Sequence, residues 1–134
     1  IYFLGPGTTT RAIVQEMDEE KTLLGVDAVL NKKVIAKDLN EKQILDLCSR
    51  YPAKIVVSPI GGQGFIFGRG NQQFTPEVIR KIGKENIIVI ATPHKLSTLK
   101  VLRVDTGDPQ LDKEFRGHFR VIADYGQEKV ILVE

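Results

Sequence analysis

A short segment near the start of the chain carries residue types suited to binding phosphate. It follows the apolar residues 1–4 and has the sequence Gly-Pro-Gly-Thr-Thr-Thr-Arg. Glycine lets the backbone approach a ligand closely, and the N–H groups and hydroxyls of a helix start donate to an anion. The candidate phosphate ligands are Gly5, Gly7, Thr8, Thr9, Thr10 and Arg11. A tight strand-to-helix turn capped by Thr8 explains the same residues, and both interpretations stay open.

A second candidate segment, PIGGQGFIFGRGNQQ at residues 59–73, holds five of the twelve glycines. A flexible linker would contain few large apolar residues, whereas this segment contains Phe65 and Phe67, which predicts an ordered loop. No Asp or Glu occurs from Leu47 to Pro76, so an anion would meet no carboxylate there. The candidate nucleotide or substrate contacts are Gly61, Gly62, Gln63, Gly64, Phe65, Gly68, Arg69, Gly70, Asn71 and Gln72. The alternative is a glycine-rich hairpin whose amides satisfy its own backbone.

Other polar residues give weaker signals. Asp27 stands among apolar residues, where a carboxylate needs a partner or a role, although a solvent-facing position on an alternating strand is the favoured interpretation. Asp105 begins an Asp-Thr-Gly-Asp run that could contact a metal or ribose, but such runs are typical of turns. His94 and His118 have no nucleophile or second ligand at a telling distance, so we predict neither a hydrolase triad nor a metal site.

The elements that must position these residues alternate along the chain. Continuous Ile/Val-rich stretches predict strands at residues 1–4, 22–30, 34–36, 54–58, 86–91 and 101–104. Capping residues predict helices that begin at Thr8, Asn40, Thr75, Thr92 and Asp108. Two strands around Tyr125-Gly126-Gln127 would form a C-terminal antiparallel hairpin at the sheet edge. This order favours an α/β fold with a mostly parallel sheet and helices on both faces, in which ligands bind beyond the carboxyl ends of the strands.

Composition narrows the possible function classes. The 134 residues suit a single domain, and the formal net charge of +2 is too small to indicate nucleic-acid binding. The sequence shows no membrane-spanning run and no signal peptide, and its single cysteine, Cys48, fits a reducing, cytoplasmic location. Because the chain opens on the apolar Ile1, we expect residues 1–134 to be the C-terminal fragment of a larger two-domain protein.

Several segments together resemble a known family. They are LGPGTTTR at residues 4–11, TLLGVD at 22–27, the glycine-rich segment at 59–73, ENIIVIAT at 85–92 and RVDTGD at 103–108. In this order they resemble the C-terminal portion of the ATP-NAD kinase family, in the branch described as predicted polyphosphate/ATP-NAD kinases. The resemblance implies phosphoryl transfer from ATP or polyphosphate to the 2′-hydroxyl of NAD, giving NADP, with Mg²⁺ accompanying the donor. It also implies, as an alternative fold, a β-rich C-terminal domain.

The resemblance assigns no catalytic residue within this chain. The Gly-Gly-Asp-Gly loop of NAD kinases belongs to their N-terminal domain and does not occur here. Asn40-Glu41 matches the family's Asn-Glu pair in letters, and the segment from Ser58 to Gly62 has glycine where a serine is typical. We therefore expect an isolated chain that folds but is inactive, and that has a missing N-terminal domain as its partner.

Two other hypotheses assign the chain to a class of protein other than an enzyme. In one, the chain is a non-catalytic module that binds a phosphorylated metabolite or sugar phosphate, because its Gly-x-Gly-Thr-Thr start is similar to the phosphate loop of sugar-phosphate isomerases. In the other, the domain mainly supports a homo-oligomer, with the glycine-rich loop at the interface.

Overall fold

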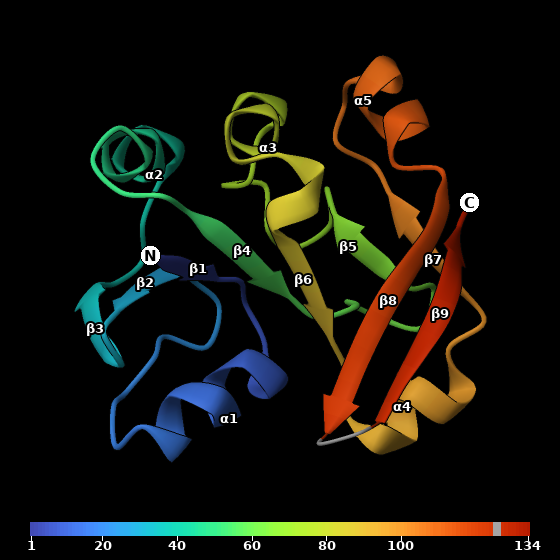
Figure 1. Cartoon of the computed structure of the whole chain (residues 1–134), viewed down its shortest axis with the longest axis horizontal. Coiled ribbons are helices and arrows are strands. Elements are labelled where there is room, and N and C mark those ends of the chain that lie inside the picture. Colours follow the sequence, from blue (N-terminus) through green and yellow to red (C-terminus); the bar gives the residue numbers. More distant parts are fainter. Residues whose placement is uncertain (125–126) are drawn as a thin grey trace.

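The computed structural model describes residues 1–124 and 127–134, which form one mixed α/β sheet structure. Its strands are β1 (Tyr2–Leu4), β2 (Asp27–Leu30), β3 (Lys33–Ala36), β4 (Lys54–Val57), β5 (Phe65–Phe67), β6 (Ile87–Ile90), β7 (Val101–Val104), β8 (Gly117–Asp124) and β9 (Gln127–Val133). They lie in the order β3-β2-β1-β4-β6-β8-β9-β7-β5 (Figure 1). Tyr125 and Gly126 of the predicted turn lie outside the described residues.

The sheet is mostly parallel, as the sequence predicted. Strands β1, β4, β6 and β8 run parallel to one another, and so do β9, β7 and β5. The antiparallel pairs are β1–β2, β2–β3 and β8–β9. The predicted C-terminal hairpin is present, but it lies within the sheet between β6 and β7, and the edges are β3 and β5. Its position at the edge was wrongly predicted because the pairing of β7 with β9 joins segments that are distant in the sequence.

The helices are α1 (Thr8–Glu16), α2 (Glu41–Cys48), α3 (Pro76–Ile82), α4 (Pro93–Thr98) and α5 (Pro109–Glu114), with a 3-10 turn, η1, at Lys84–Asn86. Thr75, Thr92 and Asp108 cap α3, α4 and α5 through their side chains, and proline follows each cap. Asn40 and Gln43 form a capping box on α2. These starts confirm the prediction. Helix α1 differs, because its N-cap is Gly7 and Thr8 is its first helical residue.

Helices cover both faces of the sheet, which confirms the predicted fold class over the β-rich alternative. The main core contains Phe3, Ile55 and Val89 together with apolar residues of α2, α3, α4 and α5. Their sequence neighbours Leu4, Val56 and Ile90 point to the other face, where they pack with Val14 of α1. Burying one such aliphatic side chain contributes about 1.5 to 3 kcal/mol. In Figure 1, α2, α3 and α5 lie at the top, whereas α1 and α4 lie at the bottom, where the arrows of β4 and β6 point.

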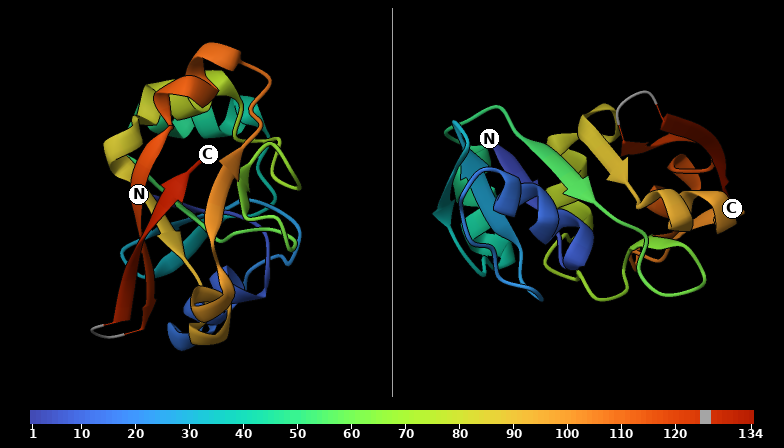
Figure 2. Two further views of the ribbon diagram at one scale, coloured as in Figure 1. Left: turned by 90° about the vertical axis from the view of Figure 1, so that its right-hand side faces the viewer. Right: turned by 90° about the horizontal axis from the view of Figure 1, so that it is seen from below.

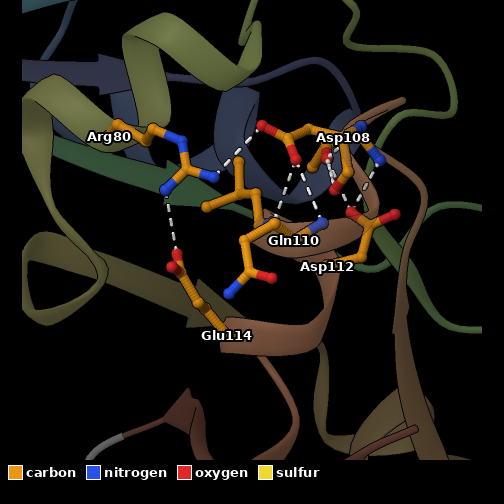
Figure 3. Close-up of polar contacts among 7 residues, drawn as sticks. Arg80, Asp108, Gln110, Asp112 and Glu114 are labelled. Carbon is orange, nitrogen blue, oxygen red and sulfur yellow. Dashed lines mark hydrogen bonds and ion pairs between the residues drawn. The ribbon is translucent and has the colours of Figure 1, made fainter.

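A group of ion pairs fixes α5 against α3. Arg80 of α3 donates to Asp108 at 3.1 Å and to Glu114 at 3.0 Å (Figure 3). The other oxygen of Asp108 accepts from the N–H groups of Gln110 and Leu111. Asp108 is thus used as a helix cap and ion-pair partner, which fits the predicted turn.

None of the helices in residues 1–124 and 127–134 is long and apolar enough to cross a membrane.

Candidate functional site

A hollow opens at the carboxyl ends of the parallel strands, where ligands bind in sheets of this kind. It has a volume of about 680 Å³ and is lined by the start of α1, the start of α4 and the end of β6. The right-hand view of Figure 2 looks at this end of the molecule, where α1 and α4 lie. Thr8 and Thr9 line it on one side, and Thr92 and Pro93 line it on the other. Glu16, two turns along α1, is its one lining carboxylate. We call it the threonine hollow.

The start of α1 is arranged to present backbone donors. Its N-cap, Gly7, makes no side-chain cap, so no side chain occupies the N–H groups of the first helical turn. Gly7 donates its own N–H to the carbonyl of Leu23 at 2.9 Å, which ties the loop to the segment before β2. Helix starts of this kind attract anions through their N–H groups and dipole.

Thr10 holds the loop in shape. It is fully buried, and its hydroxyl donates to the carbonyl oxygen of Gly5 at 2.6 Å. Its hydroxyl therefore stabilises the loop, whereas its neighbours Thr8 and Thr9 line the hollow. Arg11 is half-buried and, among the ion pairs of the described residues, it makes none.

The glycine-rich segment divides into an open part and a packed part. Gly61, Gly62 and Gln63 are exposed, and a Cβ atom added at Gly61 or Gly62 would have open space around it. Lys95 of α4 donates to the carbonyl oxygen of Gly61 at 2.7 Å, and Arg103 of β7 donates to that of Gln63 at 3.2 Å. The loop is therefore held in place from outside, as the prediction of an ordered loop requires.

The packed part explains two glycines by sheet formation. Gly64 and Gly68 flank β5, and a Cβ atom added at either would clash with a backbone carbonyl, that of Val101 or that of Asp105. Both residues also have a positive φ, which other residues rarely adopt. These glycines let β5 pair with β7. The short strand β5 was not predicted from the sequence.

The polar residues after β5 bond within the protein. Asn71 is fully buried, and its side-chain amide donates to the carbonyl oxygen of Ile66 at 2.8 Å. This hydrogen bond stabilises the turn that follows β5. The guanidinium of Arg69 lies 4.4 Å from the centre of the Phe65 ring and pairs with Asp105 at 3.4 Å. The side-chain amide of Gln72 donates to the carbonyl oxygen of Gly68 at 3.3 Å. Gly70 is exposed. Phe65 at the start of β5, Arg69 after β5 and Asp105 after β7 thus form a surface cluster.

Asp27 is buried, which corrects the expectation that it faces solvent. One carboxylate oxygen accepts from the N–H of Thr22 at 2.7 Å, and the other accepts from the Thr22 hydroxyl and the N–H of Asp38. Lys21 lies nearby and donates to the carbonyls of Thr22 and Gly25 at 2.8 Å each. Thr22 bonds to this carboxylate through its N–H and its hydroxyl, and β2 begins at Asp27 and not at Thr22 as predicted.

The surroundings of the buried Lys21 lower the pKa of its ammonium group. Burial lowers the pKa of Lys21, the charge of Asp27 opposes that shift, and the charge of Arg11 adds to it. Gly7, at the start of α1, bonds to the segment that follows Lys21 through the carbonyl of Leu23. The Asp27 and Lys21 contacts hold the segment at residues 21–25, which bonds to the loop at the start of α1 through Leu23.

The sequence did not predict that three cationic side chains lie beside the glycine-rich loop. Lys95, Lys100 and Arg103 line a second hollow of about 370 Å³ together with Gly62 and Gln63. A signal was present, because no Asp or Glu occurs from Asn86 to Val104. Helix α4 lies between the two hollows, since its N-cap lines the first and Lys95 lines the second. No described hollow is lined by both predicted loops.

The donors gathered here do not suit a metal ion. In the described part of the chain, no group of three or more His, Cys, Asp or Glu side chains could hold one. The residues that line the hollow at Gly62 and Gln63 include three cations and no carboxylate, and the cations repel Mg²⁺ but attract phosphate oxygens. These residues fit the phosphates of a ligand and do not fit the metal that would accompany them.

Fold and site together define an α/β domain with anion-suited loops at the carboxyl edge of a mostly parallel sheet. The sequence model of the ATP-NAD kinase C-terminal domain family matches residues 1–133. The chain belongs to this family and is an NAD-kinase-like module, which confirms the resemblance described above. A search of curated proteins and a search of solved structures found no match.

Proposed function

We propose that this chain is the nucleotide- and phosphate-binding part of a phosphotransferase that moves a phosphoryl group from ATP or polyphosphate to the 2′-hydroxyl of NAD, giving NADP. The observation that carries the proposal is the open start of α1 at the carboxyl edge of the sheet, within a chain that belongs to the ATP-NAD kinase C-terminal domain family. Membership in the family supports this class of reaction, and the open helix start supports the binding of a phosphate of the dinucleotide.

Each loop has a distinct part in this proposal. The N–H groups of the first turn of α1 and the hydroxyls of Thr8 and Thr9 hold a phosphate in the threonine hollow. Gly61, Gly62 and Gln63 face the rest of the nucleotide from the other side of α4. Phosphoryl transfer depends mainly on positioning and on charge stabilisation, which backbone amides and cationic side chains supply.

The group that activates the NAD hydroxyl comes from outside this chain. Asp27 accepts three hydrogen bonds in a fully buried position, so it has no free oxygen to take a proton from a substrate. Asp105 is exposed, but it pairs with Arg69 away from both hollows. A partner N-terminal domain would supply the catalytic group and most of the Mg²⁺ ligands, and the isolated chain would bind ligand without turnover.

A non-catalytic module for a phosphorylated metabolite or sugar phosphate is the second candidate. The threonine hollow supports it, because the helix start, Thr8 and Thr9 form a phosphate-suited corner that needs no other domain. This module would bind a sugar phosphate as well as NAD.

Calorimetric titration of this chain with NAD, ATP and a sugar phosphate separates the two candidates. We expect binding of NAD that falls about tenfold in the double variant T8A/T9A and stays unchanged in S97A, an α4 hydroxyl bonded to the carbonyl of His94. Equal binding of sugar phosphate and NAD would favour the non-catalytic module. Formation of NADP by the chain alone would contradict the proposal that the catalytic group lies elsewhere.

A further inference from the structure

The hairpin of β8 and β9 has apolar side chains on both of its faces. Strand β9 contains the continuous run Val130-Ile131-Leu132-Val133, in which Ile131 and Val133 are buried in the main core. Val130 and Leu132 point to the opposite face, where they are 61% and 44% exposed. A continuous apolar run is typical of a strand that is covered on both faces. The described residues leave the second face of this hairpin largely uncovered.

The exposed side chains of β8 lie on that same uncovered face. In the register of the hairpin, Arg120 lies opposite Val130. Ile122, which is also exposed, lies opposite Glu128. Residues directly opposite each other in an antiparallel pair share one face, so these four residues and Leu132 form a single surface, which we call the hairpin face. In Figure 1 no helix of the described residues crosses in front of β8 and β9.

A recess lies beside the hairpin face. The pairing of β6 with β8 joins Val89 to Val121 and Ile90 to Ile122. A hollow of about 530 Å³ lies between the two strands and is lined by Ile88, Arg120 and Ile122, among others. The surface therefore combines a protruding strand, β9, with an apolar recess next to it. A surface with both shapes can fit against a rotated copy of itself.

The hairpin face also has charges of both signs. The Nε atom of Arg120 lies 3.6 Å from the Oε1 atom of Glu128, and both side chains are exposed. This distance is too long for a hydrogen bond, so each group retains the capacity to bond to a further partner. A two-fold interface brings the same patch together from both subunits, and a patch with one cation and one carboxylate is complementary to itself.

We propose that the hairpin face binds a second copy of this chain, related to the first by a two-fold axis. Arg120 of each copy then meets Glu128 of the other, and the exposed aliphatic side chains become buried. Sheets that stack face to face lie about 10 Å apart, a spacing that Val, Ile and Leu side chains fill. None of the five residues that define the hairpin face lines the hollows at the carboxyl edge, so the inference does not rest on the proposed function.

Sedimentation equilibrium of charge-reversed variants tests the pairing across the interface. We expect the wild-type chain to form a dimer with a micromolar dissociation constant. R120E and E128R each bring like charges together and should weaken dimerisation at least about tenfold. An equimolar mixture of R120E and E128R should restore the dimer, because opposite charges meet at both contacts of the mixed pair. Neither variant chain regains its own ion pair, so only contact between chains explains the restoration.

The variant V130T tests the apolar part of the same surface. It keeps the branched shape of an exposed strand residue, so the chain should fold, and it should weaken dimerisation about fivefold. The matched control is I35T, which changes an exposed aliphatic residue on β3 at the far edge of the sheet. R50E disrupts an exposed ion pair beside α2 and controls for charge. Both controls should leave the dimer unchanged.

The outcomes separate this inference from the proposed function. A wild-type chain that stays monomeric at concentrations up to about 1 mM would overturn the inference. A dimer that R120E and V130T do not weaken, or a mixture that does not restore it, would also overturn it. Binding of NAD by a monomeric chain would leave the proposed function standing while this inference fails. A dimer restored by the mixture would support the inference even in a chain that binds no NAD.

Discussion

Asp27 shows how one buried side chain supports a loop. Its carboxylate satisfies the backbone and hydroxyl of Thr22 and the backbone of Asp38, and it lies beside the buried Lys21. A buried polar group of this kind is costly to disturb, because removing one partner leaves several donors without acceptors. We therefore assign Asp27 a positioning role for the segment that bonds to the start of α1 through Leu23.

Substitution D27A should lower the free energy of unfolding by about 3 kcal/mol or more, because the three donors that bond to this buried carboxylate lose their acceptor. Urea denaturation followed by circular dichroism measures the change. The matched control is D46A, which removes an exposed carboxylate paired with Arg50 and should cost less than about 1 kcal/mol. Equal effects of the two substitutions would show that the Asp27 hydrogen bonds contribute little to stability.

The contacts of Asp27 could not be predicted from the sequence alone. Its alternating apolar neighbours suggested a strand with one polar face, whereas its partners come from a preceding loop and from Asp38, eleven residues later. Helix starts were predictable because capping chemistry is local, as at Thr75-Pro76 and Thr92-Pro93. The start of α1 was placed correctly, but a glycine takes the capping position that Thr8 was expected to fill.

At the scale of elements, the glycine-rich segment serves two purposes. Its second half is structural, because Gly64 and Gly68 allow β5 to approach β7. Its first half, Gly61 to Gln63, is open and bordered by cations. The sequence predicted an ordered loop but not this division, because β7 lies more than thirty residues further along the chain.

Two glycine substitutions test the division. G68A should lower the free energy of unfolding by about 2 to 4 kcal/mol, because its Cβ would clash with the carbonyl of Asp105 and its φ is +90°. G62A should change stability by less than about 0.5 kcal/mol, since its Cβ meets open space. Thermal denaturation of both variants makes the comparison. A G62A variant as unstable as G68A would contradict an open first half.

The junction of α3 and α5 predicts a dependence of stability on pH. The hydrogen bond from Arg80, helped by the N–H of Leu111, lowers the pKa of Asp108. A carboxyl group whose pKa is lower in the folded state stabilises the protein above the ordinary aspartate pKa of about 3.9. That contribution is lost as the pH falls through the lower folded value.

The variant D108N separates the charge from the helix cap. Its amide oxygen can still accept the N–H groups that cap α5, but the attraction to Arg80 is lost. We expect the wild-type chain to lose more of its unfolding free energy than D108N does when the pH falls from 6 to 3. D108A removes the cap as well and should be the least stable of the three at pH 7. Parallel pH profiles of wild type and D108N would show that the ion pair does not contribute.

At the scale of the whole molecule, the sheet gathers the candidate ligand groups at one edge. The carboxyl ends of β1 and β6 carry the starts of α1 and α4, and the loop after β4 reaches the hollow lined by Lys95, Lys100 and Arg103 on the far side of α4. This placement follows from the parallel central strands, which point the same way in Figure 1. The fold class was predictable from alternating strands and helices, whereas the meeting of these three cations with the glycine-rich loop became apparent only from the folded chain.

Mapping ligand binding by two-dimensional NMR tests the central claim most directly. The claim is that nucleotide phosphates bind at the carboxyl edge of the sheet. Addition of NAD or ATP to the ¹⁵N-labelled chain should shift the amide signals of Thr8, Thr9, Gly62 and Gln63, while those at the opposite end, such as Lys81 in α3, stay in place. Shifts confined to the opposite end, or no shifts at saturating ligand concentrations, would contradict the claim.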